Sequence, residues 1–495
     1  MAPLIAGRHA PPKAAAMIEA LRGLGYSTAT ALADVIDNSI TADARNVDLM
    51  FDWNDASAVI RIVDDGRGMT ADELDRAMRL GEKNPLEERA ASDLGRFGLG
   101  LKTASFSQAR RLTVASRRRG AKNCLRWDLD VLAAAEGDGW YLLEGPHPGS
   151  EQLLDVLPGT GTVVLWEMLD RIVTTGFTQQ GFLDLIDTVE AHLAMVFHRY
   201  LEGAPPRLRL TINGRKIAPW DPFLRSNPQT WPSPIARWGA KDRRVEAQSF
   251  VLPHRDRLTP AEYDRAAGPD GWTAQQGFYV YRNERLLLAS SWLGLGDGRP
   301  WTKEEACRLA RIRLDLPNTV DADWKIDIRK SVARPPAYLR GVLTHLAEDA
   351  RARARRVFAH RGQIQRGQGR EPVVMAWRAE HLKSGVRYRI DENHPAVAAV
   401  VSQAGPLGPD LQAMLRIIEE TVPVQRIWLD TAEARETPRT GFAGERDAEV
   451  RKVLRVMFRN LTTRKGLSAE RAIETLLNTE PFHEYPALVA ALADD

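Results

Sequence analysis

Two polar residues in the segment ATALADVIDNSITADA have the types and the spacing needed for chemistry at a phosphate. Asp34 and Asn38 are four residues apart, so on a helix they share one face, away from the apolar face that contains Leu32, Val35 and Ile36. An ionised aspartate can orient and deprotonate a water molecule, and an asparagine oxygen is a hard ligand that Mg²⁺ accepts beside phosphate oxygens. A solvated helix face would show the same pattern, so this segment alone leaves both interpretations open.

A second candidate follows the strand-like run SAVIRIV. Asp64 ends this run and is followed closely by Gly66 and Gly68. A carboxylate at a strand end, beside backbone close enough to need glycine, can accept a hydrogen bond from an exocyclic amine such as that of adenine. The same residues also suit an ordinary strand-to-helix turn, in which glycines supply positive φ and the aspartate is a cap.

A third candidate is a set of glycines in DLGRFGLGLKTASFS, before a predicted helix that starts near Lys102. Gly95, Gly98 and Gly100 could present backbone N–H groups to phosphate, assisted by the helix dipole. A Walker A loop is excluded, because Leu101 separates Gly100 from Lys102 and no apolar strand precedes Gly95. A fourth and weaker signal is Thr162, whose hydroxyl could reach the base-binding carboxylate through a water molecule.

The elements that must position these residues alternate between helical and strand-like patterns as far as Pro205 and Pro206, which mark a boundary. Residues 81–100 have no period and are expected to form a long loop of the lid or binding type. We expect helices at 13–24, 28–40, 70–80 and 182–201, and strands at 47–53, 58–63, 112–116, 125–129 and 162–167.

A second module begins after this boundary. The run 208–212 followed by Asn213-Gly214 predicts a hairpin, and strands are expected at 277–281 and 324–328. A helix is predicted from Pro336 to about Phe358. Beyond it the pattern is mixed, with no internal repeat.

Composition limits the class of protein. The chain has 495 residues with 44% hydrophobic and 27% charged residues, the balance of a folded protein of several domains. Cys124 and Cys307 cannot form a disulfide framework or supply four zinc ligands. No run of about 18 apolar residues is present, and the N-terminus lacks the apolar core of a signal peptide. We therefore expect a cytoplasmic protein without membrane contact.

In this order and at these separations, the four segments resemble those of the GHKL family: gyrase, the large heat-shock chaperone, histidine kinase and MutL. The resemblance implies a Bergerat-fold α/β sandwich that binds ATP with Mg²⁺ beneath a mobile lid. The expected class is α+β, with a GHKL ATP-binding domain at 1–203 (lid about 81–100), a transducer-like α/β domain at 204–345 and a mixed, mainly helical C-terminal region at 346–495.

The resemblance also implies roles for single residues. Asp34 would be the general base, at a position where hydrolysing relatives usually have glutamate, so its shorter side chain predicts slow turnover. Asn38 would be the Mg²⁺ ligand and Asp64 the carboxylate that recognises adenine. The remaining nucleotide contacts would come from Gly66, Gly68, Met69, Gly95, Gly98, Leu99, Gly100, Leu101, Lys102 and Thr162.

The downstream module separates the branches of the family. A histidine kinase places its ATP domain last, whereas here it comes first. The segments GFYVYRNERLLLASSWLGLG and DWKIDIRKSVARPP resemble the transducer domain of MutL-like and MORC-like proteins, in which a strand-borne lysine reaches the γ-phosphate. Lys330 best matches that catalytic position, with Lys325 in reserve, although both could be surface lysines beside a strand.

The closest overall resemblance is to prokaryotic MORC-like ATPases, over about residues 15–340. It implies a homodimer that closes on ATP binding and acts as a clamp or switch on DNA, in a repair or phage-defence or restriction system, with an effector protein such as a nuclease or helicase. The tract Arg340–Arg370 has eight arginines against two acidic residues, a formal charge of +6, and could contact the backbone of duplex DNA. A solvated helix or an interdomain contact would explain the tract equally well. The alternatives for the protein as a whole are a chaperone-like ATPase acting on proteins and a nucleotide-sensing module with little turnover.

Overall fold

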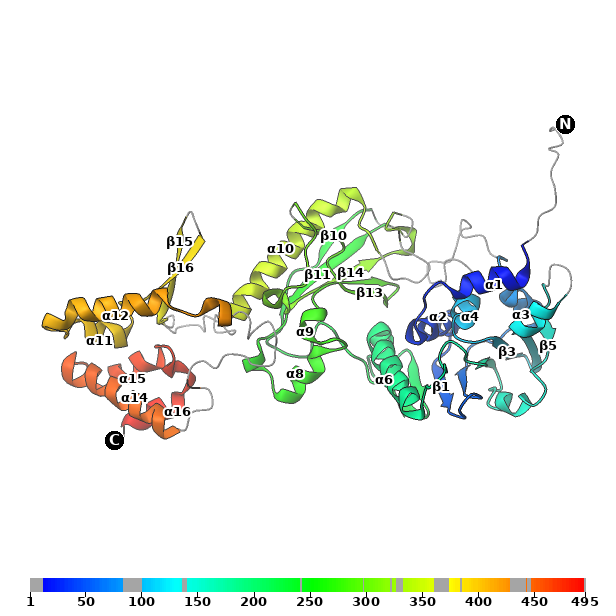
Figure 1. Cartoon of the computed structure of the whole chain (residues 1–495), viewed down its shortest axis with the longest axis horizontal. Coiled ribbons are helices and arrows are strands. Elements are labelled where there is room, and N and C mark those ends of the chain that lie inside the picture. The colour runs from blue at the N-terminus through cyan, green and yellow to red at the C-terminus, as the bar shows by residue number, and fades with distance from the viewer. Residues whose placement is uncertain are drawn as a thin grey trace, which may run out of the picture. The chain divides into compact units, whose positions relative to one another are not determined.

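The computed structural model describes residues 12–82, 100–135, 140–240, 243–296, 298–320, 323–325, 333–359, 374–382, 385–427, 442 and 447–493. The chain divides into two compact units, Met1–Gln363 and Ile364–Asp495. The first unit contains two sheets with their helices, and the second is mainly helical (Figure 1). The predicted α+β class is confirmed.

The N-terminal sheet is mixed and largely antiparallel. Its eight strands have the order β5-β4-β3-β6-β2-β1-β7-β8, and the β1–β7 pair is parallel. The strands are β1 (Asn46–Asp52), β2 (Val59–Asp64), β3 (Arg111–Arg118), β4 (Ala121–Asp128), β5 (Leu143–Glu144), β6 (Gly161–Glu167), β7 (Arg209–Ile212) and β8 (Arg215–Lys216).

Helices bury one face of this sheet. The apolar residues Leu32, Val35 and Ile36 recur at helical spacing on α2 and are buried in the same core as the inward side chains of β1 and β2. Ser27 starts α2, because its hydroxyl accepts the Thr30 N–H in a capping box. The helices of this part are α1 (Ala14–Arg22), α2 (Thr28–Thr41), α3 (Ala71–Met78), α4 (Gly100–Phe106), α5 (Leu129–Ala134), α6 (Gln179–Val196) and α7 (His198–Leu201).

The second sheet has the strand order β10-β11-β14-β12-β13, and β9 pairs with β11. Helix α10 crosses β11 and β14 and buries Leu339, Leu343 and Ala347 against them. The elements are β9 (Trp231–Pro232), β10 (Ala236–Trp238), β11 (Val245–Val251), β12 (Gly277–Arg282), β13 (Arg285–Ser291), β14 (Ala310–Leu316), α8 (Pro260–Ala267), α9 (Gly271–Ala274) and α10 (Ala337–Ala359).

The second unit has a hairpin and a small helical core. Val450, Leu454 and Leu476 are buried there together. The elements are β15 (Trp377–Leu382), β16 (Gly385–Ile390), α11 (Pro395–Val401), α12 (Gly408–Glu420), α14 (Asp447–Arg459), α15 (Ala469–Leu477) and α16 (Pro486–Ala490). Among the residues that the structure describes, no helix is both long and apolar enough to cross a membrane.

Two elements differ from the sequence-based expectation. The hairpin β7–β8 extends the N-terminal sheet, because β7 pairs with β1 in the register Asn46↔Arg209 to Leu49↔Ile212, although the sequence assigned this hairpin to the second module. The strand expected at 324–328 begins instead with a turn: Trp324 is fully buried, and Lys325 has φ 50°, which is incompatible with an extended strand. Residues 326–328 lie outside the described residues.

Candidate nucleotide-binding site

Helix α2 carries the first two candidate residues, and they lie in different surroundings. Asn38 is exposed, whereas Asp34 retains only 6% of its accessible surface. The Nδ2 amide of Asn38 donates to the Asp34 carbonyl oxygen at 3.1 Å. Because the amide nitrogen is bonded back to its own helix, Oδ1 is the atom of this exposed side chain that is chemically suited to bind a metal. This arrangement fits a neutral oxygen ligand for Mg²⁺.

The Asp34 carboxylate is held at both oxygens, so it is not part of a solvated helix face. The Tyr26 hydroxyl donates to Oδ2 at 3.0 Å, and Nη2 of Arg285 lies 3.4 Å from Oδ1. Arg285 also faces a second buried aspartate on α2, with its Nε 3.2 Å from Oδ1 of Asp37. None of Tyr26, Asp37 and Arg285 was predicted as a site residue. Arg285 follows Asp34 by 251 residues, so no local pattern could have indicated the contact.

Asp64 lies at the end of β2 and is buried with its side chain bonded to two elements. Its Oδ1 accepts the Gly66 N–H at 2.9 Å, and its Oδ2 accepts the Ser39 hydroxyl at 2.9 Å. Burial raises the pKa of the Asp64 carboxyl, and the hydrogen bonds from Gly66 and Ser39 oppose that shift. Because Ser39 follows Asn38 directly, its bond to Asp64 joins the strand end to the helix that carries the proposed metal ligand.

The glycines after Asp64 are required by close backbone contacts. A Cβ on Gly66 would lie 2.9 Å from the Ala42 carbonyl oxygen and 3.0 Å from Oδ1 of Asp64. Gly68 has φ 65°, and a Cβ there would lie 2.1 Å from the Arg117 carbonyl oxygen. Both positions therefore exclude side chains, and the loop packs directly against its neighbours.

Ser116 on β3 joins this loop to β6. Its Oγ accepts the Met69 N–H at 2.8 Å and lies 3.0 Å from Oγ1 of Thr162. Thr162 itself pairs with Asp64 in the β2–β6 register. The structure thus brings Met69, Thr162 and Asp64 together, and it adds Ser39 and Ser116, which sequence reasoning missed because single serines carry no motif.

The loop glycines are only partly covered by the structure. Gly95, Gly98 and Leu99 lie outside the described residues, whereas Gly100, Leu101 and Lys102 form the first turn of α4. The Lys102 side chain is buried, and its ammonium donates to the carbonyl oxygen of Ala77 at 2.8 Å. In this conformation that bond directs the lysine toward α3.

The structure does not test the predicted roles of the two lysines in the second module. Lys330 lies outside the described residues, and Lys325 is exposed in its turn. The role of a γ-phosphate lysine therefore stays a prediction.

Several arginines of the tract Arg340–Arg370 are engaged within the first unit. Arg351 is buried, with its guanidinium 4.9 Å from the Trp292 ring centroid and 4.8 Å from that of Trp301, and it donates to Glu304 at 3.0 Å. Arg355 donates to the same glutamate at 2.8 Å. Further contacts join Arg340 to the Gly294 carbonyl oxygen and Arg353 to the face of Trp231. Arg361, Arg366 and Arg370 lie outside the described residues.

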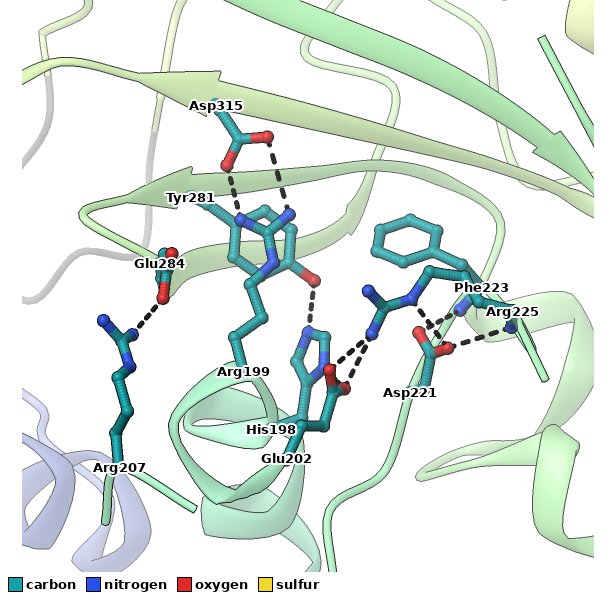
Figure 2. A network of polar contacts seen from close by, with 10 residues as sticks. All are labelled: His198, Arg199, Glu202, Arg207, Asp221, Phe223, Arg225, Tyr281, Glu284 and Asp315. Carbon is teal, nitrogen blue, oxygen red and sulfur yellow. Dashed lines mark hydrogen bonds and ion pairs between the residues drawn. The ribbon is translucent and has the colours of Figure 1, made fainter. Parts of the chain in front are cut away.

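A polar network links α7 to the second sheet (Figure 2). His198 contacts Oε1 of Glu202 through Nδ1 at 2.7 Å and the Tyr281 hydroxyl through Nε2 at 2.8 Å. Burial lowers the pKa of His198, and Glu202 opposes that shift, so the ring stays neutral near pH 7. Burial raises the pKa of Glu202, but the hydrogen bonds from His198 and Arg225 together outweigh burial and lower this pKa to about 2.

Among the residues that the structure describes, one group has the donor set of a metal site, and it belongs to this network. The group consists of His198, Glu202 and Asp221. Arg225 already serves as its cation, because it bonds both oxygens of Glu202 at 2.8 and 2.7 Å and Oδ2 of Asp221 at 2.9 Å. Figure 2 shows the Arg225 guanidinium between the two carboxylates. The cluster is therefore a structural link between the two sheets.

Comparison with known proteins identifies the N-terminal part. Residues 26–151 match the family model described as histidine kinase-, DNA gyrase B- and HSP90-like ATPase. The chain is 23% identical over 232 residues to the ATPase morc-1 of Caenorhabditis elegans, covering 38% of this chain and 27% of that protein. It is 30% identical over 186 residues to the DNA mismatch repair protein MutL of Rhodospirillum rubrum, covering 37% and 26%. The MutL of Halobacterium salinarum is 32% identical over 193 residues, covering 38% and 26%.

The chain thus matches about a quarter of the length of these curated relatives. The matched family model starts at Tyr26 and includes Asp34, Asn38, Asp64 and Lys102. The predicted resemblance to GHKL ATPases of the MORC- and MutL-like type is confirmed by these matches, of which the family model covers residues 26–151.

Proposed function

We propose that this protein binds ATP with Mg²⁺ in the site between β2 and α2 and hydrolyses it slowly. The observation that carries this proposal is the Ser39–Asp64 hydrogen bond of 2.9 Å, because it places a buried carboxylate beside the helix that bears Asn38 and Asp34. The surrounding residues 26–151 match a family of ATPases. Asp64 would accept a hydrogen bond from the adenine amine, and Asn38 would supply an oxygen to the metal that accompanies the triphosphate.

The proposed reaction uses Asp34 as the general base. Its carboxylate accepts a proton from a water molecule while the water oxygen forms a bond to the γ-phosphorus. The bond between that phosphorus and the β–γ bridging oxygen breaks, and the electron pair leaves with ADP. Asn38 would hold Mg²⁺, which would supply positive charge to neutralise the phosphates. Because the Asp34 side chain is one methylene shorter than that of glutamate, its carboxylate reaches less far toward the water and turnover is slow.

We further propose that ATP binding closes two N-terminal domains into a homodimer that acts as a clamp or switch on DNA, in repair or in phage defence or restriction, together with an effector protein. The similarity to MutL and morc-1 supports this assignment. The test measures ATP hydrolysis with and without duplex DNA, and it measures the molar mass by light scattering in the presence of a non-hydrolysable ATP analogue. We expect dimers with the analogue and faster hydrolysis with DNA. A rate of ATP hydrolysis that is unchanged by DNA but increased by unfolded protein would favour a chaperone instead.

A nucleotide sensor with little turnover is the second candidate, and the engagement of both Asp34 oxygens favours it. Single-turnover measurements separate the two functions. A sensor would bind and dimerise with ATP but release no phosphate within the lifetime of the dimer.

A further inference from the structure

Arg285 reaches from the second sheet into the helix that carries the proposed base. It is the first residue of β13, and all three of its nitrogens have acceptors. Its Nε lies 3.2 Å from Oδ1 of Asp37, its Nη2 lies 3.4 Å from Oδ1 of Asp34, and its Nη1 donates to the Leu286 carbonyl oxygen at 2.7 Å. The guanidinium is therefore fixed by its own strand while it contacts both carboxylates of α2.

The two aspartates need a cation at this place. Asp34 and Asp37 are one helical turn apart and keep only 6% and 3% of their accessible surface, so two negative charges share a buried face. The Arg285 side chain is buried with them at 6% exposure, and its delocalised fork suits two acceptors at once. His192 on α6 adds no charge, because burial and then Arg285 lower its pKa to about 4.

The contact also sets the direction of the Asp34 carboxylate. Tyr26 bonds one oxygen from the N-terminal side of α2, and Arg285 contacts the other oxygen from the second sheet. Loss of Arg285 would leave Asp34 with a neighbouring like charge and with one fewer constraint on its rotation.

We propose that Arg285 is a positioning residue for ATP hydrolysis: it holds Asp34 in the orientation in which the carboxylate accepts the proton from water. The inference rests on the proposed function, since Asp34 must be the base. With Arg285 in this role, residues from both sheet layers build the hydrolytic site. A displacement of β13 relative to α2 would then change the rate of hydrolysis without removing any group that binds the nucleotide.

The test compares Arg285→Ala, Arg285→Lys and the control Arg207→Ala in the full chain. Arg207 is a suitable control because it pairs with Glu284, the residue before Arg285, in an exposed ion pair. We expect Arg285→Ala to lower kcat about 10- to 100-fold, as a small displacement of a catalytic group does, with the Kd for ATP unchanged within about 2-fold. Arg285→Lys should recover part of the rate, since a point charge cannot fork between two carboxylates. Arg207→Ala should match the parental protein.

A merely structural role is separated by a second comparison. In the Asp34→Ala background, adding Arg285→Ala should leave the residual rate unchanged, because there is no base to position. Should Arg285→Ala fail to fold, Arg285→Lys and Asp37→Asn carry the test: the first should still lower kcat about 10-fold at constant Kd, and the second should lower it less.

The outcomes distinguish this inference from the proposed function. Parental kcat in Arg285→Ala or Arg285→Lys, or equal losses of kcat and ATP affinity, would overturn the positioning role alone. A parental protein that binds ATP but never hydrolyses it would also overturn this role, while supporting the sensor. A parental protein without ATP binding would overturn the proposed function itself.

Discussion

At the residue scale, Asp64 is the group on which nucleotide recognition depends. Its carboxylate accepts bonds from Gly66 and Ser39 and would accept the adenine amine as a further donor. In Asp64→Asn an amide nitrogen would meet that amine, so a charge-assisted bond is replaced by a donor–donor contact. We expect the affinity for ATP with Mg²⁺ to fall at least 100-fold, to below detection by calorimetry.

The control is Asp65→Asn, because Asp65 accepts backbone N–H groups of Arg45 and Asn46 on the exposed side of the same strand end. This variant should bind ATP like the parental protein. Equal affinity in Asp64→Asn and the parental protein would exclude Asp64 as the adenine acceptor.

Asp34 supplies the second prediction at this scale. We expect Asp34→Ala to bind ATP with parental affinity and to lose hydrolysis, because the residue is proposed to touch the water and not the nucleotide. Asp34→Asn should behave in the same way and keeps the side-chain volume beside Tyr26 and Arg285. Calorimetry gives the affinity and phosphate release gives the rate. Phosphate release at the parental rate would dismiss Asp34 as the base.

At the scale of elements, the loop between β2 and α3 is shaped by a close approach to β3. Gly68 has φ 65°, and a Cβ there would lie 2.1 Å from the Arg117 carbonyl oxygen, whereas Gly120, in the β3–β4 turn, has φ 84° and open space around it. We expect Gly120→Ala to cost about 1 kcal/mol of unfolding free energy for the strained φ, and Gly68→Ala about 3 kcal/mol or more. Thermal unfolding measures both, and only Gly68→Ala should also weaken ATP binding.

Helix α10 combines arginines with different roles. Arg351 contacts the rings of Trp292 and Trp301 and bonds Glu304, so Arg351→Ala should destabilise the first unit by about 2 kcal/mol. Arg356 is exposed, and Arg356→Ala should change stability by less than about 0.5 kcal/mol. If the proposed duplex contact is made here, the Arg356 variant should also lower the slope of log affinity against log salt by about 1. Affinity that is independent of salt would exclude phosphate contacts.

At the scale of the whole first unit, the network of Figure 2 couples the two sheets and responds to acid. Glu202 has a pKa of about 2 in the folded chain and an ordinary value of 4.5, so its stabilising contribution is complete above pH 4.5 and is lost as the pH falls toward 2. The pKa of His198 is also lowered, from 6.5, so protonation of the unfolded chain below pH 6.5 favours unfolding as well.

We therefore expect the melting temperature to fall progressively below pH 6.5, and to fall less steeply in Glu202→Gln, which has no carboxylate to protonate. Glu284→Gln is the matched control, since Glu284 forms an exposed ion pair at the same interface. The control should keep the parental pH dependence. A parental slope in Glu202→Gln would contradict the assigned role of this carboxylate.

The sequence by itself determined what depends on neighbours along the chain. The apolar spacing of Leu32, Val35 and Ile36 predicted α2, and alternation predicted β2 with Asp64 at its end. The order and separation of the motifs were enough to identify the ATPase family, which the match over residues 26–151 confirms.

Only the tertiary structure decided which groups meet across long separations. The buried Asp34 carboxylate is contacted by Tyr26, eight residues before it, and by Arg285, 251 residues after it. On an isolated helix the same residue would be exposed to water. The parallel pairing of β7 with β1 moved a hairpin from the second module to the first sheet. Such contacts form because the folded chain must pair its buried charges and its buried backbone N–H and C=O groups. The spacing of residues along the chain does not specify which groups pair.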